Sequence, residues 1–62
     1  MQITLKAARV NAGLTQQQVQ QATGIARSTL RRWEQGKTSP RTSELAVLCN
    51  LYGVTMEHIK MK

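Results

Sequence analysis

The residues of this 62-residue chain whose types could do chemistry gather in one short segment. Four polar side chains follow closely on one another there: Arg27, Ser28, Arg31 and Arg32. If the segment is a helix, residues four apart share a face, which points these side chains away from Leu30 and Trp33. A guanidinium offers a planar fork of donors that fits O6 and N7 of guanine, and a hydroxyl can donate or accept at several base edges. The pattern therefore predicts a helix that reads base edges in the major groove of double-stranded DNA.

A second interpretation of this face is the solvated side of an amphipathic helix, because charged residues usually face water. The charge balance argues against it, since nine Lys and Arg stand against three Asp and Glu, a net charge of +6. Such a field attracts polyanions: DNA, RNA or an anionic membrane surface. RNA recognition would need stacking aromatics and membrane binding a long basic amphipathic helix, whereas Trp33 and Tyr52 are the only aromatic residues. Double-stranded DNA is therefore the predicted partner.

The sequence lacks the sets of residues that other kinds of chemistry require. Cys49 is the only cysteine and no Cys/His cluster has metal-ligand spacing, so we expect no disulfide and no metal site. The sequence has no carboxylate pair, nucleophile-base set or glycine-rich phosphate loop, so we expect no enzyme, no cofactor and no small-molecule ligand. No apolar run approaches the ~20 residues that cross a bilayer, and no signal-peptide cleavage site is visible. These features predict a cytoplasmic protein that does not bind membranes.

Helical spacing, interrupted by four glycines, predicts an all-α fold with a single domain over residues 1–62. We expect a compact unit of five short helices, at about residues 4–12, 15–23, 26–35, 43–52 and 55–60. Thr15 followed by Gln18 is a capping-box pattern that starts the second helix, and Gly24 ends it. The two helices around Gly24 have the plan of a helix-turn-helix. This plan places the arginine face on its second helix.

A resemblance to the phage repressor/Cro-type (Xre-like) helix-turn-helix family appears in residues 13–40, GLTQQQVQQATGIARSTLRRWEQGKTSP. The shared features are the GLTQ start of the second helix, the turn glycine, the STL triplet and the ending WEQGKTSP. The tail LYGVTMEHI is similar to the family's end of helix four and start of helix five. The resemblance covers nearly the whole chain. It implies a repressor-like five-helix domain that binds DNA sequence-specifically and regulates transcription, in a bacterium or a phage-infected host cell.

The resemblance implies a role for each matching residue. The expected base contacts are Arg27, Ser28, Arg31 and Arg32, where Arg31 reaches either a flanking base or a phosphate. The expected DNA-backbone contacts are Gln16, Lys37, Thr38 and Arg41, of which Arg41 is equally well explained by loop solvation. Gln16 would meet a phosphate through its side chain or its backbone amide, or brace a base-contacting side chain. Arg9 and Glu34 match a structural ion pair that orients the third helix, so Glu34 is not assigned to acid-base catalysis.

The resemblance also implies a homodimer on a two-fold operator, with half-sites about 34 Å apart. The candidate dimer surface comprises the apolar residues least needed inside one protomer: Val47, Leu51, Met56, Ile59 and Met61. An equally good alternative is that these residues only fill a small core. A second functional class fits the same fold, a protein-interaction module such as the antitoxin half of a toxin-antitoxin pair. Co-purification of a stoichiometric partner would distinguish that class from a DNA-binding regulator.

The chain departs from the family pattern at three positions. Gln20 stands where the second helix usually has a small residue, so its side chain must turn outward or widen the crossing with the third helix. Ala26 stands where Ser or Thr often caps the third helix, which forfeits up to about 1 kcal/mol of capping. Thr42 stands where an apolar residue is common, and it or Ser43 is the expected cap of the fourth helix. None of these changes removes the arginine face.

Overall fold

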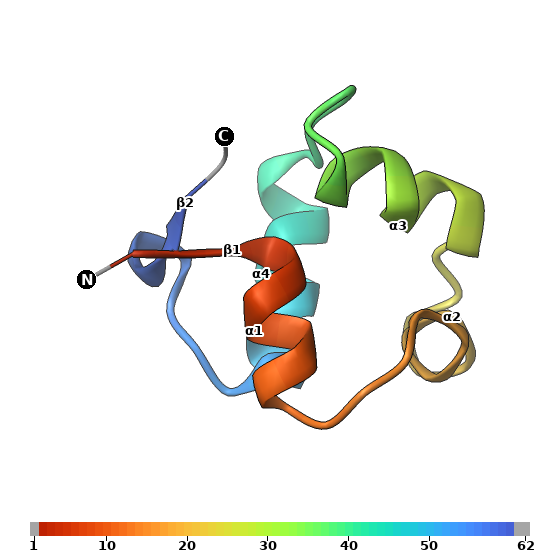
Figure 1. The fold of residues 1–62 in the computed structure, drawn as a ribbon, viewed down its shortest axis with the longest axis horizontal. Coiled ribbons are helices and arrows are strands. Elements are labelled where there is room, and N and C mark those ends of the chain that lie inside the picture. The colour runs from red at the N-terminus through yellow and green to blue at the C-terminus, as the bar shows by residue number, and fades with distance from the viewer. Residues whose placement is uncertain (1, 61–62) are drawn as a thin grey trace.

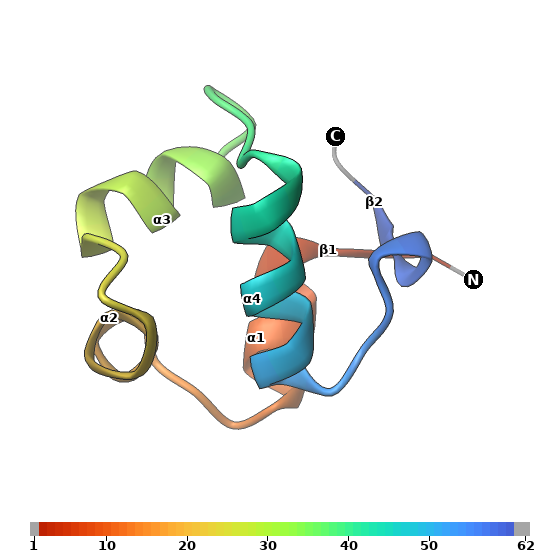
Figure 2. The ribbon, with the colours of Figure 1, turned by 180° about the vertical axis from the view of Figure 1, so that it is seen from behind.

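The computed structural model describes residues 2–60, and this part of the chain is mostly helical. Four α-helices follow one another in it: α1 (Leu5–Asn11), α2 (Gln16–Thr23), α3 (Arg27–Glu34) and α4 (Thr42–Tyr52). The remaining elements of the described part are a 3-10 turn, η1 (Met56–His58), and two short strands, β1 (Ile3–Thr4) and β2 (Ile59–Lys60). α1 and α4 lie side by side at the centre, with α2 and α3 to one side and the strands to the other (Figure 1 and Figure 2).

The ends of α2 follow from the residues at each end. The Thr15 hydroxyl accepts from the backbone N–H of Gln18 at 3.1 Å, and the Gln18 side chain accepts from the N–H of Thr15 at 2.8 Å. At the other end Gly24 adopts a left-handed conformation with φ +78°, which costs a residue with a Cβ about 1–2 kcal/mol. Only Gly24, Ile25 and Ala26 separate α2 from α3. The expected bounds of both helices agree with the structure to within one residue.

All four helices contribute to one core. Its buried residues are Leu5, Ala8, Val19, Leu30, Trp33, Leu48, Cys49, Tyr52 and Ile59. Leu30 of α3, Leu48 of α4 and Val19 of α2 have no exposed surface, and burying each such side chain favours folding by about 1.5–3 kcal/mol. Leu30 and Trp33 therefore fix the inner side of α3, which leaves its opposite side free.

The prediction of a fifth helix over residues 55–60 is wrong. Met56–His58 form a single 3-10 turn, and Ile59–Lys60 extend to pair in parallel with Ile3–Thr4. A six-residue helix is too short to be stable by itself. An extended backbone instead suits the β-branched side chain of Ile59 and pairs its strand with β1. The described part is therefore mostly helical with a two-stranded sheet, and not all-α.

The strand pair also changes the candidate dimer surface. Ile3 lies opposite Ile59 and Thr4 opposite Lys60 in the register of the pair, and Ile59 is only 4% exposed. Ile59 is part of the protomer's own core, so this residue does not belong to an exposed dimer surface, contrary to expectation. Met61, another candidate for that surface, lies outside the described residues.

α4 begins before its expected cap. Arg41 occupies the N-cap position and Thr42 is already helical, so neither Thr42 nor Ser43 is the cap. The backbone N–H of Arg41 donates to Oε1 of Glu44 at 2.9 Å. A carboxylate in the first turn is also favoured by the positive end of the helix dipole. Glu44 therefore fixes the start of α4 and, with it, the end of the loop that follows α3.

Candidate nucleic-acid interface

The outer side of α3 presents the four residues predicted to contact bases: Arg27, Ser28, Arg31 and Arg32. All four are exposed, whereas Leu30 and Trp33 on the inner side are 0% and 7% exposed. α3 lies at the periphery of the molecule, beside α2 and away from the strands (Figure 1). The structure thus brings the four polar side chains to one outer helix face, and a helix is of a size that the major groove admits.

The three arginines of this face have no neutralising partner in the described part of the chain. The one salt bridge that the structure gives within residues 2–60 joins Arg9 to Glu34 and does not involve the face. Glu44, another of the three carboxylates in the sequence, bonds to the N-cap of α4. An unpaired arginine face produces a strong local positive potential, which attracts a polyanion.

A buried ion pair fixes α3 to α1. Arg9 Nε lies 2.7 Å from Glu34 Oε2, and the two side chains are 11% and 4% exposed. Arg9 Nη2 donates to Glu34 Oε1 at 3.2 Å and Nη1 to the Leu14 carbonyl at 2.9 Å. The hydrogen bond to Glu34 raises the pKa of Arg9 and outweighs the opposing effect of burial. The carboxylate is therefore committed to a permanently charged partner, a structural role and not an acid-base one.

Gln16 joins the same ion pair. Its side-chain Nε2 donates to Glu34 Oε1 at 3.0 Å. A side-chain amide has two N–H donors and one acceptor oxygen, so this bond leaves the second Nε2 hydrogen and Oε1 of Gln16 available. The backbone N–H of Gln16 is also available, because it lies in the first turn of α2 and has no intrahelical acceptor. Both expected routes from Gln16 to a phosphate, through the side chain and through the backbone amide, are therefore compatible with the geometry.

The loop after α3 holds the remaining backbone-contact candidates. Lys37, Thr38 and Arg41 are all exposed, and the loop extends past the end of α3 (Figure 1). The N–H of Lys37 donates to the Arg32 carbonyl at 3.0 Å, and Gly36 has φ +76°. These features fix the start of the loop on the last turn of α3, so Lys37 moves with the arginine face.

Comparison with known families agrees with this geometry. A family model described as helix-turn-helix matches residues 5–59, from the start of α1 into β2. The chain belongs to the Xre-like helix-turn-helix family. The resemblance found in the sequence is confirmed, and the chain is a DNA-binding transcription regulator of the Xre type. Searches of curated proteins and of solved structures gave no match.

Two shallow polar hollows flank Arg27 on this helix-turn-helix protein. One, of about 340 Å³, is lined by Gln17, Gln20, Gln21 and Arg27. The other, of about 370 Å³, is lined by Arg9, Thr15, Gln16, Gln17 and Arg27. Side-chain amides of α2 therefore surround the first residue of α3. No sequence pattern predicts that Gln17 and Gln21 lie beside Arg27, although five glutamines within six positions of α2 are a visible signal.

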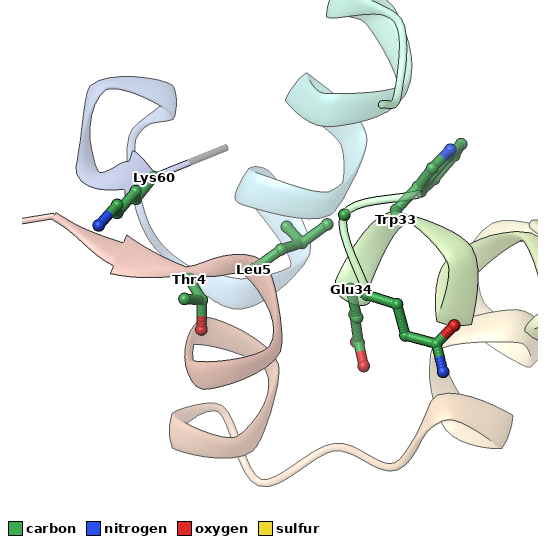
Figure 3. A pocket seen from close by; sticks show the side chains of 7 residues that line it. Thr4, Leu5, Trp33, Glu34 and Lys60 are labelled. Carbon is green, nitrogen blue, oxygen red and sulfur yellow. The ribbon is translucent and has the colours of Figure 1, made fainter. Parts of the chain in front are cut away.

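A third pocket of about 300 Å³ opens between the start of α1, the end of α3 and β2 (Figure 3). Its lining comprises Thr4, Leu5, Trp33, Glu34, Gln35, Gly36 and Lys60. It shares no lining residue with either hollow beside Arg27. The Glu34 carboxylate in this pocket already binds Arg9 and Gln16. The pocket is therefore separate from the arginine face.

The other groups that could react are built into the core. Cys49 is buried, and burial raises the pKa of its thiol, which keeps it in the less reactive protonated form. Burial also raises the pKa of Tyr52 to about 12, with the Glu34 charge adding to the effect. Residues 2–60 contain no group of three or more His, Cys, Asp or Glu placed to hold a metal ion. None of the helices described is long and apolar enough to span a bilayer.

Proposed function

We propose that this protein is a sequence-specific regulator of the repressor/Cro type, from a phage or a bacterium, that inserts α3 in the major groove of an operator. The observation that carries the proposal is the exposed, unpaired face of Arg27, Ser28, Arg31 and Arg32 on a helix held by the Arg9–Glu34 pair. A rigidly held helix presents its hydrogen-bond donors at fixed positions, so these donors match some base sequences better than others.

The contacts divide into two kinds. Arg27, Ser28 and Arg32 read base edges, and Arg31 reaches a flanking base or a phosphate. The phosphate contacts come from residues on both sides of α3: Gln16, Lys37, Thr38 and Arg41. The exposure of the last three and the position of Gln16 at the start of α2 support this division. Positive charge supplies affinity for any duplex, and base contacts supply the choice among sequences.

Gln16 also braces Arg27 in this proposal. Both residues line the same hollow, and the bond from Gln16 Nε2 to Glu34 leaves the Gln16 oxygen as an acceptor. A guanidinium carries five N–H donors, so it can bind a base with some and the Gln16 oxygen with another. The brace would hold Arg27 in one rotamer and reduce the entropy lost when the base contact forms.

The active form in this proposal is a homodimer on half-sites about 34 Å apart. Val47 and Met56 are 47% and 42% exposed, and Leu51 is half-buried beside the core. Exposed apolar side chains of this size lose contact with water when two protomers associate. Analytical ultracentrifugation tests the assembly: a monomer at high concentration, both with and without a selected duplex, would contradict the dimer.

Selection of bound sequences from random duplex DNA, followed by competition binding, tests base reading. We expect Arg27→Ala and Arg32→Ala each to cost about 1–3 kcal/mol against the selected duplex and much less against a scrambled one. Lys6→Ala is the matched control, since Lys6 is an exposed cation on α1 and not on the arginine face. Equal losses on the selected and scrambled duplexes would show that α3 does not read bases.

A further inference from the structure

The first turn of α3 has no cap of its own. Ala26 occupies the N-cap position and provides no side-chain hydrogen bond, although the first N–H groups of a helix lack intrahelical acceptors. Gln20 of α2 supplies an acceptor from outside the helix, because its Oε1 accepts from the backbone N–H of Arg27 at 3.3 Å. Gln20, one departure from the family pattern, therefore accepts a hydrogen bond from the first turn of α3, and the N-cap of that turn, Ala26, is the other departure.

Gln20 holds the turn between α2 and α3 at both of its ends. Its backbone carbonyl accepts from the N–H of Gly24 at 2.8 Å, at the end of α2. Its side chain reaches the N–H of Arg27, at the start of α3. The small residue usual at this position could make the first contact and not the second, because it has no long side chain with an acceptor.

We propose that Gln20 is a positioning residue for Arg27: by binding the Arg27 amide, Gln20 sets the start of α3 and the base edge that the Arg27 guanidinium reaches. This inference rests on the proposed function, in which Arg27 contacts a base. A conventional cap acts at other atoms, since a serine at position 26 would bind the N–H of Ser28 or Thr29 and leave the Arg27 amide free. The two kinds of cap are therefore separable by experiment.

The test compares Gln20→Met, Ala26→Ser and the double variant with the wild-type chain. Methionine keeps the length of the side chain and lacks its amide acceptor. Gln35→Met is the control, because Gln35 is an exposed glutamine that lines only the pocket separate from the arginine face and whose side chain makes no hydrogen bond within residues 2–60. The measurements are hydrogen exchange of the Arg27 amide in the free protein, the melting temperature, and base preference in selected duplexes.

In Gln20→Met we expect the Arg27 amide to exchange several-fold faster and the melting temperature to fall by about 4 °C. Preference at the base pair that Arg27 reads should fall about 3- to 10-fold, with other positions of the duplex little changed. Adding Ala26→Ser should restore the melting temperature and leave both the fast exchange and the relaxed preference. The control should match the wild type in all three measurements.

Two results would overturn the positioning role alone. One is an Arg27 exchange rate and base preference in Gln20→Met that equal those of the wild type. The other is recovery of the base preference by Ala26→Ser, which would make Gln20 a general cap of α3. A wild-type chain that binds every duplex equally would overturn the proposed function and the positioning role together. Exchange of the Arg27 amide would then still report on the hydrogen bond, because that measurement needs no DNA.

Discussion

Arg9 of α1 donates two hydrogen bonds, of 2.7 and 3.2 Å, to Glu34, the last residue of α3. The same carboxylate accepts a third hydrogen bond from Gln16 at the start of α2. Three helices therefore meet at one side chain that is 4% exposed. Because these bonds are directional and buried, they fix the rotation of α3 about its own axis as well as its distance from α1.

Removal of the carboxylate should be among the most destabilising changes to this protein. Glu34→Ala leaves the Arg9 guanidinium buried without its charged partner and with only the Leu14 carbonyl as acceptor, which costs about 3–5 kcal/mol. A domain of this size is stabilised by about 3–9 kcal/mol in total, so we expect the variant to lose about half of its stability or more. Urea unfolding followed by the fluorescence of Trp33, the only tryptophan, measures the effect.

Two further variants test whether the loss of stability in Glu34→Ala comes from the buried ion pair. Glu57→Ala removes an exposed carboxylate and should change the free energy of unfolding by less than about 0.5 kcal/mol. The double variant Arg9→Met and Glu34→Leu should recover much of the loss, since apolar pairs replace buried ion pairs well. A single Glu34→Ala variant as stable as the wild type would contradict the structural role of the pair.

Lys37 should contribute affinity without contributing selectivity. A phosphate contact releases about one counterion, so Lys37→Ala should lower the slope of log affinity against log salt by about one. The loss should be the same on a selected and on a scrambled duplex. Fluorescence anisotropy at several salt concentrations gives the slope. An unchanged slope would assign the exposed Lys37 side chain to ordinary solvation.

Tyr52 should make the protein unstable in alkali. Its pKa is raised from 10.0 to about 12 in the folded chain, so the unfolded chain loses this proton first as the pH rises. The neutral Tyr52 phenol therefore makes its full contribution to the free energy of unfolding below pH 10. This contribution is lost as the pH rises from 10 to about 12, and the total loss is about 2–3 kcal/mol. Absorbance of tyrosinate follows the ionisation directly, because the chain has one tyrosine.

Tyr52→Phe is the matched variant for that experiment. The Tyr52 hydroxyl is buried and has no hydrogen-bond partner within the described residues, so its removal should leave stability at pH 7 unchanged or raise it by up to about 1 kcal/mol. The part of the alkaline loss that belongs to Tyr52 should disappear. A wild-type tyrosine that titrates near pH 10 in the folded protein would contradict the burial of this hydroxyl.

Substitutions of Ile59 and Val47 should distinguish a core residue from a surface residue by their effects on stability. Ile59→Ala empties part of the core and should cost about 2–5 kcal/mol even in dilute protein. Val47→Ser changes a residue that is 47% exposed and should alter stability by less than about 0.5 kcal/mol. Thermal unfolding at two protein concentrations makes the comparison. Opposite results, with Ile59 tolerant and Val47 sensitive to concentration, would return Ile59 to the dimer surface.

Much of the half that contains α2 and α3 could be predicted from local sequence. The capping box of Thr15 and Gln18, the left-handed Gly24 and the apolar spacing of Leu30 and Trp33 each act within a few residues. Such short-range rules specify where α2 begins and ends and which side of α3 is buried. The family resemblance, and not the spacing of residues, suggested the pairing of Arg9 with Glu34.

The rest depended on contacts between distant residues. The strand at Ile59 exists because Ile3 lies beside it, and these residues are almost a whole chain apart in sequence. The bonds from Gln16 to Glu34 and from Gln20 to Arg27 depend on how two helices are oriented. Local patterns contain no information about either, because every glutamine of α2 looks alike in sequence.

The pairing of β1 with β2 has a consequence for the order of events during protein synthesis. β1 is made before α1 to α4, and its partner β2 is added only after these helices have been made. The helices, whose hydrogen bonds are local, can form on the nascent chain, whereas closure of the sheet must wait. The buried Ile59 therefore completes the core last, so a ribosome that stalled before residue 59 would leave that end of the core open.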